Sequence, residues 1–428
     1  MTNHIKPFLF FAFYLCSLSS QADLFYELNN KVYKEFVQTV QLYPVNEPLL
    51  DPILYLNDPR LLTLSFDILG TETAVYNFTI VHCTYDWKLS DLQLIEYVNG
   101  YQEDEIRDFR YSLNTLTPYI HYSLTFPGEN LQPKLSGNYI LVVYDSQLNA
   151  DNILFTRRFM VVETKASMAV SIPQYPKNPD YIKTKHQVDV TVIADNTYRV
   201  NPNQSLNLVI KQNGRWDNAV VGLKPNYIYS DKLTYEYDEL TVFDASNQFR
   251  NFDMKSFKYQ SEYIQKIQME PDCFSVELWP SKRRNTANYI LEKDIFGRKL
   301  IKARDDQDSE IEGDYAWVQF FLDYPVPLTQ DDIYLIGALN DWNLDENSRL
   351  VYNFERKGYE GKLFLKQGYY NYLYGVVEKG KTKADVSTIE GNFWDTQNEY
   401  SIFLYFRKPG TVYDQLVGYQ VVLSHNYD

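Results

Sequence analysis

The sequence predicts an all-β protein built from three tandem β-sandwich domains of the immunoglobulin-like type. Its 428 residues include 38 Tyr, 25 Phe and 6 Trp but only 17 Gly. Aromatic side chains suit the half-buried face of a sheet better than a helix. Many short segments alternate apolar with polar residues, and turn-forming residues separate them. Since no segment carries a long apolar stripe at helical spacing, we expect few helices.

The period-two alternation locates the strands. Between Leu62 and Ile68 every second residue is apolar, which predicts a strand with one buried face. Comparable runs lie at residues 76–80, 139–144, 188–193, 206–210, 275–279, 317–322, 333–336, 369–374, 401–406 and 420–423. Turn signals such as PG at 127–128 and NG at 213–214 fall between them. Short strands divided by turns are typical of sandwiches.

The first 22 residues have the pattern of a secretory signal peptide. Lys6 precedes an apolar run from Phe8 to Leu18, and small residues at 20–22 suit cleavage after Ala22. The run is too short to cross a hydrocarbon core of about 30 Å. No later stretch approaches about 18 consecutive apolar residues, so we expect an exported protein with no transmembrane segment in the mature chain. Alternating aromatic strands behind an export signal are also typical of transmembrane β-barrels, but long polar connections favour compact sandwiches here.

Two segments suggest where the chain divides. Residues 163–173 lie between a predicted strand and a proline-rich stretch, and residues 303–314 read ARDDQDSEIEGD, almost entirely polar and acidic. We therefore expect a signal peptide over 1–22 and domains over 23–165, 166–305 and 306–428. A calcium loop starting at Asp308 would need Glu at its twelfth position, where Gln319 stands. We interpret the acidic segment as a solvated linker.

Charge and motifs exclude several functions. The formal net charge of -15 disfavours nucleic acid as a partner, because binding to phosphates needs a cationic surface. The sequence has no G-x-S-x-G, H-E-x-x-H, P-loop or G-x-G-x-x-G motif. His82 and His121 are interpreted as sheet residues rather than ligands. We expect no catalytic residue, cofactor or metal, and leave Cys83 and Cys273 as either two thiols or one bridge.

Several short motifs follow one another over nearly the whole chain. They are HCTYDW at 82–87, EYVNG at 96–100, SGNY at 136–139, TRRF at 156–159, NQFRNF at 247–252, DIFGR at 294–298, GDYAWV at 313–318 and GNFW at 391–394. Their content and order resemble the type IX secretion system plug proteins of the Bacteroidetes. The resemblance implies a non-enzymatic periplasmic protein, peripheral to the outer membrane. Its implied partner is the giant outer-membrane translocon barrel, whose periplasmic opening it closes when no substrate is in transit.

The last predicted domain supports an alternative function. The segment IYLIGALNDW at 333–342, followed by GYYNY at 368–372, looks like the glycogen-binding type of carbohydrate module with its early-set immunoglobulin-like fold. That likeness implies weak glycan binding, with Trp342, Tyr370, Tyr372 and Trp394 as stacking or interface residues. A second stacking aromatic is expected near residues 380–383, but these are Gly, Lys, Thr and Lys. The alternative is therefore a secreted or periplasmic glycan-binding protein.

Overall fold

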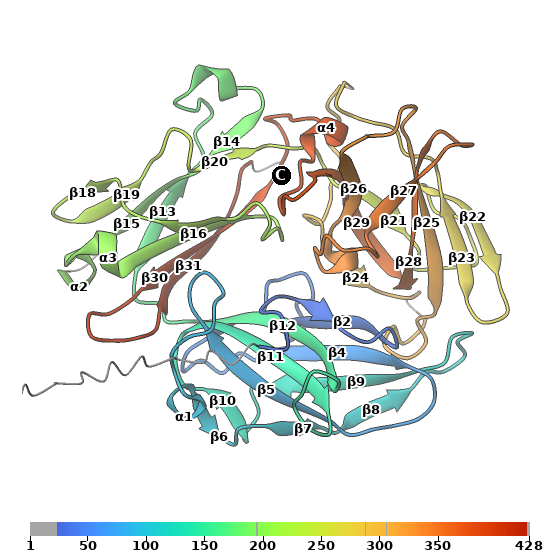
Figure 1. The fold of residues 1–428 in the computed structure, drawn as a ribbon, viewed down its shortest axis with the longest axis horizontal. Helices are drawn as coiled ribbons and strands as arrows, with labels where there is room; N and C mark the ends of the chain where they lie inside the picture. Colours follow the sequence, from blue (N-terminus) through green and yellow to red (C-terminus); the bar gives the residue numbers. More distant parts are fainter. Residues whose placement is uncertain (1–23, 194–195, 287, 305, 426–428) are drawn as a thin grey trace, which may run out of the picture.

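The computed structural model describes residues 24–193, 196–286, 288–304 and 306–425, so the predicted signal peptide lies outside the described residues. The fold is mostly β with multiple antiparallel sheets, as predicted (Figure 1). Every predicted strand run coincides with an observed strand, except that Val188 and Trp279 lie one residue outside theirs. The helices of the described residues are single turns: α1 (Leu94–Tyr97), α2 (Asn196–Arg199), α3 (Pro202–Ser205), α4 (Ser387–Glu390), η1 (Pro179–Tyr181) and η2 (Ala338–Asn340).

The first unit, residues 24–165, packs two sheets face to face. One has the order β1 (Lys31–Val32), β12 (Ile153–Val162), β11 (Gly137–Asp145), β5 (Tyr76–Cys83) and β7 (Asp104–Ile106), with β3 (Ile53–Tyr55) parallel to β12. The other has the order β2 (Val37–Pro44), β4 (Leu62–Leu69), β9 (Tyr119–Phe126) and β8 (Asp108–Tyr111). A ribbon of β6 (Val98–Gly100) and β10 (Leu131–Pro133) flanks them. The rings of Phe66 and Phe155, one from each sheet, lie 5.0 Å apart in the shared core.

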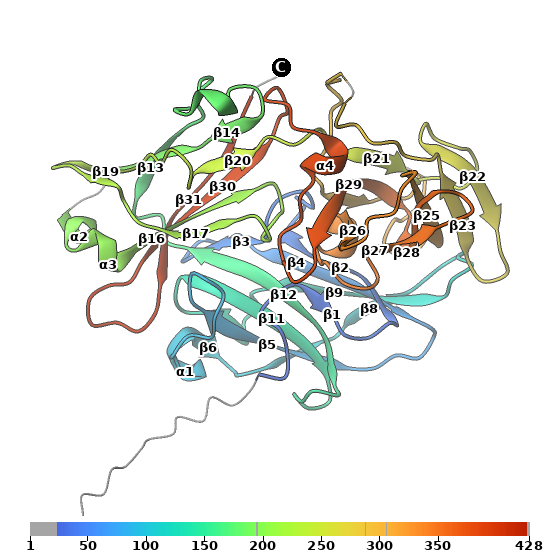
Figure 2. The ribbon, with the colours of Figure 1, turned by 45° about the horizontal axis from the view of Figure 1, so that its top comes forward.

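The second unit combines residues 166–248 with residues 393–425. One sheet has the order β13 (Ser167–Ser171), β15 (Asp189–Ile193), β19 (Lys232–Tyr235) and β18 (Tyr227–Ile228). The other has the order β17 (Val220–Leu223), β16 (Leu206–Gln212), β30 (Glu399–Phe406) and β31 (Gln415–Leu423), which Figure 2 shows side by side. A pair of β14 (Lys185–Gln187) and β20 (Val242–Asp244) closes one end.

The third unit, residues 249–392, is one nine-stranded sheet rather than the predicted pair of sheets. Its order is β21 (Arg250–Asp253), β29 (Gly368–Glu378), β26 (Asp331–Ile336), β27 (Arg349–Asn353), β28 (Gly358–Lys366), β25 (Tyr315–Asp323), β23 (Phe274–Leu278) and β22 (Ile264–Met269), with β24 (Lys299–Ile301) also on β29. The sheet curves into a nearly closed barrel (Figure 1). The two halves are continuous because β27 pairs with β26 on one side and with β28 on the other.

Strand pairing crosses the predicted division between residues 305 and 306 in both directions. Strands β30 and β31 lie beyond it, yet Leu206 to Gln212 pair with Phe406 to Tyr400 along β16. Strands β21 to β24 lie before it, yet β21 and β24 pair with β29 and β23 pairs with β25. Local alternation identifies strands but carries no information about such distant partners.

The acidic segment is not a solvated linker, and that interpretation was wrong. Asp314 is buried and accepts hydrogen bonds from the backbone N–H groups of Leu116 at 2.6 Å and Thr117 at 3.2 Å. Asp308 and Glu310 both pair with Arg110 on β8. The segment is held on the first unit because its carboxylates meet donors there.

Two further expectations can be compared with the structure. Cys83 is buried and Cys273 half-buried, and both are free thiols. Within the described ranges, no helix is long and apolar enough to cross a membrane.

Candidate functional site

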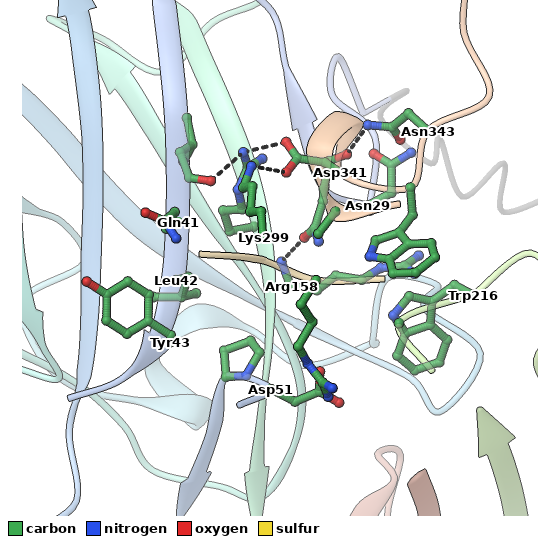
Figure 3. A pocket seen from close by; sticks show the side chains of 18 of the residues that line it. Asn29, Gln41, Leu42, Tyr43, Asp51, Arg158, Trp216, Lys299, Asp341 and Asn343 are labelled. Atoms are coloured by element: carbon green, nitrogen blue, oxygen red, sulfur yellow. Dashed lines mark hydrogen bonds and ion pairs between the residues drawn. The ribbon is translucent and has the colours of Figure 1, made fainter. Parts of the chain in front are cut away.

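The three units meet around a cavity of about 520 Å³ (Figure 3). Figure 1 shows the first unit beneath the other two. Residues of all three units line the cavity. The first unit supplies Asn29, Gln41, Asp51, Arg157 and Arg158, the second supplies Lys211, Trp216 and Asp217, and the third supplies Arg298, Lys299, Asp341 and Trp342. Charged side chains therefore lie among apolar ones in the cavity wall, at the place where segments far apart in the chain converge.

Ion pairs in and around the cavity join different units. Arg157 on β12 donates to Asp341 in the third unit at 2.7 Å, and Lys211 on β16 donates to Asp51 in the first unit at 2.6 Å. Arg298 in the third unit pairs with Glu399 at the start of β30. These three pairs connect every combination of two units.

The charged groups in these ion pairs are largely shielded from water. The Arg157 and Lys211 side chains are 4% and 3% exposed, so neither can be solvated by bulk water. Burial alone would raise the pKa of Asp341, but Arg157 and Lys299 hold it below its usual value. A buried charge that loses its partner is strongly unfavourable, so separating two units would carry a high energetic cost.

A second polar cluster links the first and third units away from the cavity. The Asp67 carboxylate on β4 accepts from Lys366 Nζ at 2.6 Å, from Tyr315 Oη at 2.6 Å and binds His121 Nδ1 at 2.6 Å. Burial alone would raise the pKa of Asp67, but Lys366 and His121 hold it below its usual value. The cluster brings together β4, β9, β25 and β28.

The first and second units also share an apolar core. Trp87, Ile140 and Met160 of the first unit pack in one cluster with residues of the second, namely Val209, Phe403, Tyr405 and Leu416. Tyr405 donates from its hydroxyl to Asn138 Oδ1 at 2.7 Å across the same interface. Apolar burial and a directional hydrogen bond therefore fix this interface together.

Trp342 lies at a junction between units. It is half-buried, and a Cβ added at Gly214 of the second unit or Gly297 of the third would lie within 2.5 or 2.3 Å of its ring. Its ring also meets Phe249 edge-on, with centroids 6.1 Å apart. Trp342 and Asp341 both have left-handed backbone, with φ of 63° and 55°, which turns the chain after η2.

The other predicted stacking residues lie in different surroundings. Tyr370 and Tyr372 are 1% and 4% exposed in the core of the third unit, where Tyr370 stacks on Phe252 at 5.2 Å. Their rings are not open to a ligand at the surface. Trp394 is half-buried in the second unit, and its carbonyl oxygen lies 2.7 Å from His186 Nε2 and 2.8 Å from His425 Nε2.

The structure reveals charged residues at the contacts between units that the sequence analysis missed. Asp67 alternates with apolar neighbours and was assigned to a solvent face, yet it is fully buried because the third unit covers that face. Arg157 and Arg158 belong to the TRRF motif at 156–159, which the sequence analysis used only as one of the motifs that carry the family resemblance. In the described part of the chain no group of three His, Cys, Asp or Glu side chains could hold a metal ion. Three ion pairs of the cavity instead fasten the units together: Arg157 with Asp341, Lys211 with Asp51 and Arg298 with Glu399.

Known proteins resemble this chain to different degrees. The family model for the type 9 (IX) secretion system plug protein 1st domain matches residues 37–163. The crystal structure of a hypothetical protein from Parabacteroides merdae is 35% identical, with a TM-score of 0.88 over 93% of this chain and 100% of that chain. The C-terminal domain of the Streptococcus agalactiae AgI/II polypeptide BspA is 8% identical, with a TM-score of 0.15 over 90% of this chain and 99% of that chain, too low to indicate a shared fold. No curated protein matches the chain.

Proposed function

The chain belongs to the type IX secretion system plug protein family, and from this membership we propose that it is a non-enzymatic periplasmic plug. It docks on the periplasmic opening of the outer-membrane translocon barrel and closes that opening when no substrate is in transit. The protein is peripheral to the outer membrane and reaches the periplasm through its predicted signal peptide.

The structural observation behind this proposal is that buried ion pairs join the three units into one body. A plug must hold its shape against the pore, and close-packed sheets with buried cross-links resist deformation. Asp67 with Lys366, Arg157 with Asp341, and Lys211 with Asp51 are buried pairs between units. Breaking one such pair leaves an unpaired buried charge, so relative movement of the units is opposed.

Affinity purification tests the proposed partner. The tagged mature protein is purified from native membranes after crosslinking, and its companions are identified by mass spectrometry. We expect a very large outer-membrane barrel protein at near-equal stoichiometry. A matched sample from cells carrying an unrelated tagged periplasmic protein controls for abundance. Failure to recover a barrel protein above this control would overturn the proposed docking.

For Trp342 we propose an interfacial role in place of the glycan-stacking role. The contacts of its ring with Gly214 and Gly297 support this assignment, since a ring held between two units offers little free surface. We expect immobilised α-glucans to retain none of the protein at millimolar sugar concentration. Retention that disappears in Trp342→Ala would instead restore the glycan-binding function.

We also propose that the first two units are immunoglobulin-like sandwiches and that the third, with the early-set-like segment, is inserted into the second. Two facing sheets in each of the first two units support this description. Within the described residues, the domain bounds then become 24–165, 166–248 with 393–425, and 249–392.

A further inference from the structure

Arg158 differs from the other cations that line the central cavity. Arg157, Lys211, Arg298 and Lys299 each pair with a carboxylate, whereas no described carboxylate pairs with Arg158. Its Nε donates to the carbonyl of Leu28 at 2.9 Å. The described residues give its two terminal nitrogens no hydrogen-bond acceptor. Arg158 therefore keeps hydrogen-bonding capacity at the edge of a cavity.

Two tryptophan rings hold the Arg158 guanidinium. Its central carbon lies 4.2 Å from the ring centroid of Trp87 and 5.2 Å from that of Trp216, and Figure 3 shows Arg158 beside Trp216. Aromatic faces attract a guanidinium and limit its rotation. Burial lowers the pKa of Arg158 to about 10, so the group still carries its charge at neutral pH. A guanidinium held in one orientation can bind a carboxylate or phosphate through two parallel N–H···O hydrogen bonds.

The charges around the cavity do not balance. Five cationic side chains line it, against the three carboxylates of Asp51, Asp217 and Asp341. Glu399 and Arg215, which pair with Arg298 and Asp217, add one charge of each sign. Two positive charges therefore remain in a chain whose formal net charge is -15. One is Arg158, and the other arises because Asp341 is shared by Arg157 at 2.7 Å and Lys299 at 3.4 Å.

We propose that the central cavity binds a small oxyanion, a molecule bearing a phosphate or carboxylate group, with Arg158 as its principal donor and Lys299 as the second cation. The volume of about 520 Å³ suits a small molecule rather than a chain segment. Arg158 belongs to the first unit and Lys299 to the third, so the bound anion contacts both units. This site is independent of the proposed plug function.

Binding is tested with inorganic phosphate and with citrate. Isothermal titration calorimetry and thermal unfolding of the mature protein are run in each sodium salt, with sodium chloride at equal ionic strength as the reference. We expect saturable binding, and a rise in Tm with concentration, for at least one anion. A response to phosphate alone identifies a phosphate ligand, and a response to citrate alone identifies a carboxylate ligand. If neither anion binds more than chloride, the site does not exist as proposed.

Variants decide whether Arg158 is the donor. Arg158→Gln is expected to weaken binding at least tenfold, and Arg158→Lys also weakens it because one ammonium cannot make the bidentate contact. Arg60→Gln removes an exposed arginine of the same unit, paired with Asp58, and leaves binding unchanged. If Arg158→Gln fails to fold, Lys299→Met decides, since Arg157 still neutralises Asp341 in that variant. Wild-type affinity in either folded cavity variant would overturn the assignment of that residue.

Discussion

Lys366 on β28 and Asp67 on β4 are 299 positions apart in the chain, yet their charged groups lie 2.6 Å apart with each side chain 1% exposed. Each is on a different unit, so the pair joins the sheet of the first unit to the sheet of the third. Each of the two buried charges needs the other, because a buried charge without a partner has lost its hydration and gained no ion pair in return.

Lys366→Met is expected to destabilise the protein by about 3–5 kcal/mol, since it leaves Asp67 buried without its cation. Chemical denaturation measures the change in the free energy of unfolding. Lys362→Met is the matched control on the same strand, because Lys362 is exposed. Its ammonium lies 4.6 Å from the ring centroid of Trp317, so we expect a change of at most about 1 kcal/mol. The double variant Asp67→Asn with Lys366→Met should recover part of the loss. Equal effects of Lys366→Met and Lys362→Met would show that the buried pair is not important for stability.

Gly214→Ala is expected to loosen the junction at Trp342. The added methyl group would lie 2.5 Å from the indole, so the ring or the backbone must move, at a cost of about 1–3 kcal/mol. Gly128→Ala is the control, because nothing lies within 4 Å of the added atom. Thermal unfolding compares the two variants. In a Trp342→Ala background, Gly214→Ala should have little further effect on stability. If the losses of the two single variants simply add in the double variant, the contact between the two residues is contradicted.

Stability is expected to fall as the pH drops from about 6.5 to about 4. Burial lowers the pKa of both His82 and His186 to about 4, so the unfolded chain binds protons in this window while the folded chain does not. Each histidine then removes about 2 kcal/mol of stability by pH 4.5.

Denaturant unfolding at pH 7 and pH 4.5 measures this difference. His82→Gln is expected to show a smaller loss than the wild type, because glutamine does not titrate. His186→Gln is expected to show a similar reduction, because burial lowers the pKa of His186 in the same way. A pH dependence identical in wild type and His82→Gln would contradict the assignment.

A fragment of residues 166–305 is not expected to fold, although the sequence pattern predicted these bounds for a domain. Strand β16 pairs with β30, which the fragment lacks, and the core of the second unit contains Tyr400, Ile402 and Leu404. A chain joining residues 166–248 to 393–428 through a short flexible linker is the matched comparison. Circular dichroism and limited proteolysis distinguish the two. Cooperative unfolding of the 166–305 fragment would show that the C-terminal strands are dispensable.

Local patterns in the sequence were sufficient to predict the strands but not their partners. The alternation at residues 62–68 predicts β4 because a strand repeats every two residues. The same alternation assigns Asp67 to solvent, and it cannot show that another unit covers that face. Trp342 was predicted as a stacking or interface residue, but only the structure brings Gly214 and Gly297 to its ring. Ion pairs between units depend on distant strands meeting, so Arg157 with Asp341 carries no local signal.

The most direct test of the proposed plug is the conductance of the purified translocon in a planar bilayer, recorded before and after the mature protein is added to the periplasmic side. We expect a large, steady conductance that falls to near zero as the protein binds and returns when it is washed out. Heat-unfolded protein at the same concentration is the control. Unchanged conductance, with binding of the protein to the translocon confirmed in the same sample, would contradict closure of the pore.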